Sequence, residues 1–158
     1  MSLPNRPPQR EVDARGFALV VLSYRCAMAE ICGAHAKYCA GVWEALETVA
    51  PGDEAEDLYR CFFAFVRALL AVAERPLEWR QAYCAHLCRD EWLAVSMIDA
   101  AQRADVAELL QAASELIGVE ALGDALNAAQ ALASALSRRG LYLCPRSGGD
   151  RCPMRTLH

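Results

Sequence analysis

The chain has 158 residues, of which 55% are hydrophobic and 23% are charged, and its formal net charge is −4. This length and composition are typical of one globular domain with an ample core, and no apolar run approaches the roughly 18 residues that a membrane span needs. The charge is uneven, because residues 138–158 sum to +4 and residues 1–137 therefore sum to −8. An acidic body with a basic end argues against a protein that binds nucleic acid with its whole surface.

The amino-terminal residues and the cysteines indicate the cellular compartment. Residues 1–10 read MSLPNRPPQR, a polar, proline-rich arm without the pattern of a signal peptide. Six of the eight cysteines lie in segments with strong helical patterns, which can fold without disulfides. We therefore expect a cytoplasmic, intracellular protein in which the thiols are reduced. The six are Cys26, Cys32, Cys39, Cys61, Cys84 and Cys88.

A long first helix is predicted at the start of the chain. From residue 11 onwards, apolar residues recur at spacings of three and four until Pro51 ends the pattern. This period predicts one helix over residues 11–49. Because a helix of that length, roughly 57 Å, would exceed its neighbours, we expect a bend near Gly33 or Gly41.

The next two helices are predicted on either side of Pro76. Asp53 followed three residues later by Glu56 has the pattern of a capping box, which predicts the start of the second helix. Proline disfavours the helical conformation in the residue before it and suits a first helical turn. The second helix should therefore end near Arg75, and the third should run from Pro76 to about Arg103.

The last two helices have recognisable ends. Asp105 with Glu108 is a second capping-box pattern, and Gly118 closes the short helix that follows. The final helix stops at Gly140. Because successive helices with short turns favour antiparallel neighbours, the sequence predicts an all-α fold, an antiparallel four- to five-helix bundle with a long first helix. Its parts are a flexible arm over residues 1–10, a single bundle domain over residues 11–139 and an irregular basic tail over residues 140–158.

The helical cysteines are candidate metal ligands. If neighbouring helices are antiparallel, three of them lie at similar heights, as counted from the turns at Pro51 and Pro76. Thiolates with a nearby imidazole are ligands that suit Zn(II) or Cu(I). The pattern therefore predicts a soft-metal or thiol-redox site. Its candidate residues are Cys39, Cys61 and Cys88, completed by Cys84 or His35.

Core packing is the other interpretation of the same thiols. Free cysteine behaves as a small hydrophobe and is often buried, and no spacing in the chain matches a compact metal signature such as a pair of CxxC motifs. On a helix with ~100° between residues, His86 would point away from Cys84, so these neighbours would not act together. In this interpretation no cofactor is expected.

The tail contains a separate pair of cysteines followed by a histidine. These residues could close a small disulfide loop, supply ligands to a zinc shared with another chain, or remain as exposed thiols near arginines. A terminal segment without any such role is an equal alternative. The residues concerned are Cys144, Cys152 and His158.

No catalytic motif is present. The chain lacks a P-loop, GxGxxG, GxSxG and HExxH, and we interpret the acidic pair Asp90 and Glu91 as helix surface. Leu22 and Trp43 make the apolar stripe of the first helix wider than a closed bundle requires. We therefore expect a non-enzymatic protein that binds another protein or a second copy of itself, as a regulator, adaptor or assembly subunit, without nucleic acid or membrane as partners. Binding or sensing of Zn or Cu(I), or thiol-redox chemistry, is the alternative.

Overall fold

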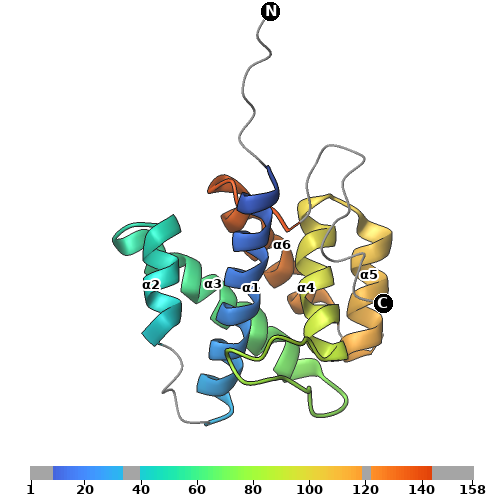
Figure 1. Ribbon diagram of the computed structural model, residues 1–158. Coiled ribbons are helices and arrows are strands. Elements are labelled where there is room, and N and C mark those ends of the chain that lie inside the picture. Colours follow the sequence, from blue (N-terminus) through green and yellow to red (C-terminus); the bar gives the residue numbers. More distant parts are fainter. Residues whose placement is uncertain (1–8, 34–39, 119–121, 144–158) are drawn as a thin grey trace, which may run out of the picture.

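The structure is a computed structural model that describes residues 9–33, 40–118 and 122–143 (Figure 1). Within these residues every regular element is an α-helix, as the sequence predicts, but there are six helices instead of four or five. Their bounds are α1 Gln9–Ile31, α2 Ala40–Val49, α3 Asp53–Val72, α4 Arg89–Gln102, α5 Val106–Ile117 and α6 Gly123–Arg138.

The predicted long first helix over residues 11–49 is wrong. The helix α1 ends at Ile31, and α2 begins only at Ala40. Gly33, one of the two positions at which a bend was expected, has a φ of +73°. Glycine adopts this left-handed conformation easily, and it commonly stands just after the end of a helix. An apolar period that continues through residues 34–39 therefore does not show that the helix itself continues.

The predicted third helix from Pro76 to Arg103 is also wrong in its first half. Residues 73–88 form an irregular segment, here called the 73–88 loop, and α4 starts at Arg89. Backbone groups of this loop form hydrogen bonds with buried side chains of α1 and α4 in place of helical hydrogen bonds. Proline at position 76 therefore follows the end of one helix without beginning the next.

The ends of α3 and α5 test the two predicted capping boxes. At α5 half of the predicted capping box forms: the carboxylate of Asp105 accepts a hydrogen bond from the backbone N–H of Glu108 at 3.1 Å, but the side chain of Glu108 binds Arg103. Gly118 ends the helix with a φ of +89°, as predicted. At α3 the capping box is wrong, because the residue before the helix is Gly52, which has no side chain to accept a bond. The acids at the start of α3 still lie at the positive end of the helix dipole.

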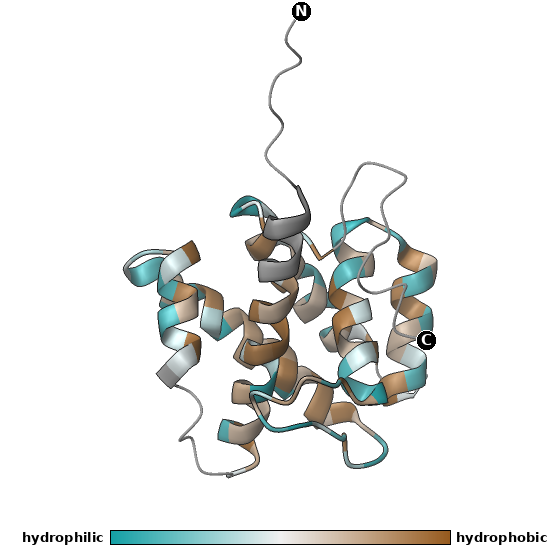
Figure 2. Ribbon diagram, in the orientation of Figure 1, coloured by the Kyte–Doolittle hydropathy of each residue, from teal (hydrophilic) through white to brown (hydrophobic). Residues whose placement is uncertain are grey.

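The core is built around α1 and α4, which are buried on nearly every side in their middle parts. From residue 19 to residue 29 of α1, all side chains except Leu22 are buried, and the same holds for residues 90–100 of α4 except Trp92. Figure 2 shows the ribbon of α1 at the centre of the molecule, with hydrophobic residues along its middle part. The middle parts of both helices are therefore surrounded by the rest of the fold, and the polar side chains that they carry, such as Arg25 and Glu91, are buried with them. Around this centre, α3 packs against α1 and α6, while α4 packs against α5 and α6.

The residues after α6 return to the packed body. Leu141 and Leu143 are both buried. The side-chain amide of Gln102 holds this segment at two points: its Nε2 donates to the carbonyl of Leu141 at 2.7 Å, and its Oε1 accepts from the N–H of Leu143 at 3.0 Å. The first residues of the predicted tail therefore pack against the end of α4. No helix among the described residues is long and apolar enough to cross a membrane.

Candidate functional site

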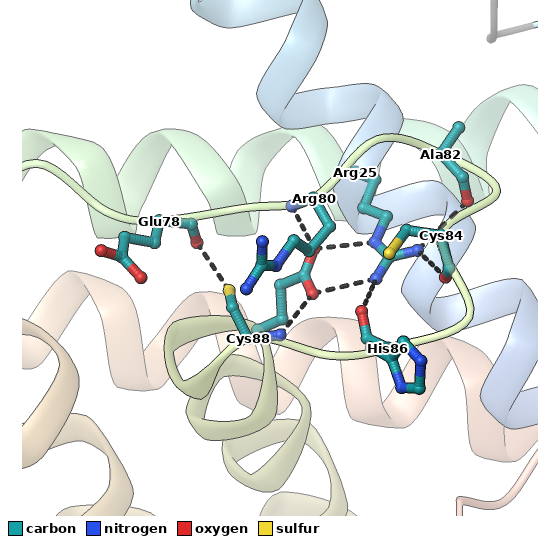
Figure 3. A network of polar contacts seen from close by, with 8 residues as sticks. Arg25, Glu78, Arg80, Ala82, Cys84, His86 and Cys88 are labelled. Atoms are coloured by element: carbon teal, nitrogen blue, oxygen red, sulfur yellow. Dashed lines mark hydrogen bonds and ion pairs between the residues drawn. The ribbon is translucent and has the colours of Figure 1, made fainter.

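A single arginine of the central helix organises the 73–88 loop. Arg25 is the largest fully buried side chain of the described residues, and its guanidinium uses all five N–H donors. Three of these hydrogen bonds go to backbone carbonyls of the loop (Figure 3): Ala82 at 3.3 Å, Cys84 at 2.7 Å and His86 at 2.9 Å. The other two go to the carboxylate of Glu91. The planar fork of arginine suits this task because its donors diverge in fixed directions.

Glu91 completes the same network from the start of α4. Its two oxygens accept from Nε and Nη2 of Arg25, at 2.7 and 3.0 Å. They also accept from the backbone N–H of Arg80 at 2.7 Å and of Cys88 at 3.0 Å. Buried ions are stable in a fold only when they are paired and hydrogen-bonded. Both conditions hold for Arg25 and Glu91, so the pair fixes the loop between two core helices.

The neighbouring acid gives the loop a second attachment. The carboxylate of Asp90 accepts hydrogen bonds from both terminal nitrogens of Arg75, at 2.6 and 2.7 Å, and from the backbone N–H of Glu78 at 2.7 Å. Cys88 precedes α4 as its N-cap residue: its thiol accepts from the backbone of Glu91 and donates to the carbonyl of Glu78 at 3.3 Å. The loop is thus held at both ends of its length by the first turn of α4.

This arrangement turns the loop backbone inward and its side chains outward. While alternate carbonyls from Ala82 to His86 bind Arg25, the side chains of residues 83–86 are exposed. Tyr83 is the most exposed large hydrophobic residue of the described chain, at 68%. Rigid scaffolds that carry exposed loops in this way are where proteins commonly place binding residues.

An apolar groove of about 310 Å³ lies between this loop and α1. Phe17, Ala18, Val21 and Leu22 form its helical wall, and residues 82–85 with Leu87 form its loop wall. Arg25 also borders the groove, but its charge is neutralised by Glu91. The groove and the exposed residues 83–86 together are called the loop face below.

The electrostatics of the network keep its acids ionised. Hydrogen bonds from Arg75 lower the pKa of Asp90 below its ordinary value. Burial acts to raise the pKa of Glu91, but the bonds from Arg25 and from two backbone N–H groups outweigh it, and the pKa is lowered. Burial raises the pKa of the Cys88 thiol, so this cysteine is protonated at neutral pH. A protonated thiol is a poor nucleophile and a poor metal ligand.

The structure places three of the predicted ligands at separate points. Cys61 lies on α3, and burial raises the pKa of its thiol above the ordinary value, although the positive charges of Arg138 and Arg139 act against this rise. Cys84 is exposed in the loop and Cys88 is buried at its end, so the helical register that aligned them does not exist. Among the described residues, no group of three or more His, Cys, Asp or Glu side chains could hold a metal ion. The remaining candidates lie outside the described residues, and the metal site stays a prediction: His35, Cys39, Cys144, Cys152 and His158.

Sequence reasoning missed the three buried charged residues that hold the 73–88 loop. Asp90 and Glu91 were interpreted as helix surface, which is wrong, since they are 2% and 0% exposed. Arg25 was passed over although it is the one charged residue in the apolar stretch from residue 16 to residue 29. A lone charge inside such a stretch implies a buried partner, and that signal was available in the sequence.

Comparisons of the chain with models of known protein families, with curated proteins and with solved structures find no significant match.

Proposed function

We propose that this protein is a non-enzymatic binding protein that contacts another protein through its loop face. The observation that carries the proposal is the use of all five donors of Arg25, three of them on carbonyls of one exposed loop. A loop that served only as a connection would not need a buried ion pair to fix its conformation. Here the fixed backbone presents Tyr83 and His86 to solvent beside an apolar groove.

The composition of the loop face suits protein recognition. Tyrosine is enriched at the energetic centres of interfaces, since it buries a large rigid surface and keeps a polar end. A loop already held in its bound conformation loses little conformational entropy on binding. The groove beside it offers apolar area that a partner can cover.

Site-specific photo-crosslinking tests this function. A photoreactive phenylalanine analogue replaces Tyr83 in the full chain, and a matched variant carries it at Ala131, an exposed position of α6. After irradiation in cells that express the protein, we expect a discrete crosslinked species from position 83 and none from position 131. When the exposed substitution Ala85→Glu in the loop face is added to the position-83 variant, the crosslinked species should disappear. Equal crosslinking from both positions, or none from position 83, would contradict the proposal.

A soft-metal or thiol-redox function is the second candidate. Two exposed free thiols favour it, Cys32 after α1 and Cys84 in the wall of the groove. Elemental analysis of protein purified under reducing conditions tests it, together with Cys39→Ser and Cys88→Ser variants. Bound zinc or copper that is lost in these variants would support the second candidate over core packing.

A further inference from the structure

A glycine near the start of α2 makes room for the side chain of Tyr83. Gly41 is the second residue of α2. A Cβ atom built on it would lie far inside the contact distance of the Tyr83 hydroxyl oxygen and 3.5 Å from the ring carbon Cζ. In glycine a hydrogen occupies that direction, so the Cα–H of Gly41 lies against the hydroxyl oxygen of Tyr83. The 73–88 loop therefore touches α2 through this one side chain.

The backbone conformation of Gly41 does not require glycine. Gly41 is helical, and its φ lies outside the left-handed region, in contrast to the φ of Gly33 and of Gly52. At such a position alanine is the better helix former, because glycine loses more conformational freedom on folding. The contact with Tyr83 gives a reason for the less favourable residue, since any side chain larger than hydrogen would displace the tyrosine hydroxyl.

Arg25 fixes the backbone on both sides of Tyr83. Its guanidinium donates to the carbonyls of Ala82 and Cys84, the residues before and after the tyrosine. A tyrosine side chain has two χ angles, so a fixed backbone and a fixed hydroxyl together determine the direction of the ring. Tyr83 is nevertheless 68% exposed and borders the apolar groove. The ring is thus held at both ends and still open to a partner.

We infer that Gly41 positions Tyr83 for partner binding at the loop face. This inference rests on the proposed function and adds α2 to it, since α2 holds the end of a side chain whose backbone is held by α1. A larger residue at position 41 would turn the ring away from its place beside the groove. The turn costs the fold little, because most of the ring is exposed. It weakens binding, because an anchor that must be reoriented loses the advantage of a preorganised surface.

Nuclear magnetic resonance of the full chain tests the contact itself. Nuclear Overhauser cross-peaks should join the Hα atoms of Gly41 to the ring protons of Tyr83, and the ring resonances of Tyr83 should shift in Gly41→Ala. Gly123→Ala is the matched control, since Gly123 is the first residue of α6 and a Cβ on it would meet nothing within 4 Å. This control should leave the Tyr83 resonances unchanged. Absence of the cross-peaks in the wild type would overturn the inference.

Photo-crosslinking tests the role in binding. The photoreactive phenylalanine analogue is placed at His86, an exposed residue of the loop face, so that Tyr83 stays intact. Gly41→Ala and Tyr83→Ala should each lower the yield of the crosslinked species by roughly tenfold, as the loss of an interface anchor does. The two changes together should lower it no further, because they act on the same side chain. Gly123→Ala should give the wild-type yield.

Urea denaturation separates lost binding from lost folding, because Gly41→Ala should unfold at the same urea concentration as the wild type or at a higher one. A lower unfolding midpoint would overturn the inference, since the glycine would then serve the fold. A full crosslink yield in Gly41→Ala with a low yield in Tyr83→Ala would also overturn it and would leave the proposed function standing. No crosslink from position 86 in the wild type, with the cross-peaks present, would overturn the proposed function and with it the role of Gly41 in binding.

Discussion

Arg25 and Glu91 are 66 positions apart in the sequence and form a bidentate ion pair, with N–O distances of 2.7 and 3.0 Å, in the centre of the fold. The pair links the middle of α1 to the first turn of α4. Through its remaining donors and acceptors it also binds the backbone of the 73–88 loop from both sides. The conformation of an exposed surface is thereby determined by two residues that solvent does not reach.

Arg25→Ala should destabilise the protein strongly. The change leaves the Glu91 carboxylate buried without its ion partner, and three loop carbonyls lose their donor. Removing one member of a buried pair typically costs about 3–5 kcal/mol. Urea denaturation followed by circular dichroism measures the loss. The control is Arg60→Ala, which removes an exposed pair with Glu56 and should cost less than about 1 kcal/mol. Similar losses in both variants would show that the buried network is unimportant.

The part of the fold that could be predicted from sequence is the part in which local signals and packing agree. At α5 a capping aspartate, an apolar period and a closing glycine all define the same helix. The apolar period of the sequence continues past Ile31, where α1 ends, and the period alone does not distinguish one long helix from two shorter ones. The apolar pattern therefore predicted the all-α class correctly and the boundaries of the helices poorly.

The candidate site could not be derived from local patterns. The 73–88 loop is irregular because its backbone groups bind the side chains of Arg25, Asp90 and Glu91. Asp90 and Glu91 belong to α4, which follows the loop, whereas Arg25 precedes the loop by dozens of residues. A helical conformation of residues 76–88 would satisfy the same backbone groups with local hydrogen bonds, and it is equally consistent with the sequence. Only the lone arginine in the apolar stretch of α1 indicated a long-range partner.

Acid should weaken the attachment of the loop. The pKa values of Asp90 and Glu91 in the folded protein lie below those of the free side chains, 3.8 and 4.5. Their contribution to stability is therefore complete above about pH 4.5 and is lost as the pH falls through the folded-state values. We expect the free energy of unfolding to decline below that pH, and Asp90→Asn to decline less steeply from a lower starting value. Glu47→Gln, an exposed change on α2, should follow the wild type. Parallel curves for Asp90→Asn and wild type would refute this account.

Substitutions of Cys88 separate capping from metal binding. As the N-cap of α4, its side chain accepts one hydrogen bond and donates another. A serine hydroxyl can do both and is a preferred N-cap, whereas alanine can do neither and typically costs about 1 kcal/mol. Cys88→Ser should therefore match the wild type in urea denaturation, and Cys88→Ala should be less stable. If instead both variants lose the same stability, and added zinc stabilises only the wild type, Cys88 acts as a ligand.

The rates at which individual thiols are alkylated should report whether Arg25 holds the loop closed. In the wild type, iodoacetamide should modify the exposed Cys84 quickly, while Cys88 and Cys26, which are 6% and 1% exposed, should react slowly. Arg25→Lys keeps a positive charge near Glu91 but loses the planar fork that binds three carbonyls. Peptide mass spectrometry should then show faster modification of Cys88, because the segment that covers it is released. Cys26 lies in the core of α1 and is the internal control for global unfolding. An unchanged rate at Cys88, or an equal rise at Cys26, would mean that Arg25 stabilises the whole fold without specifically ordering the loop.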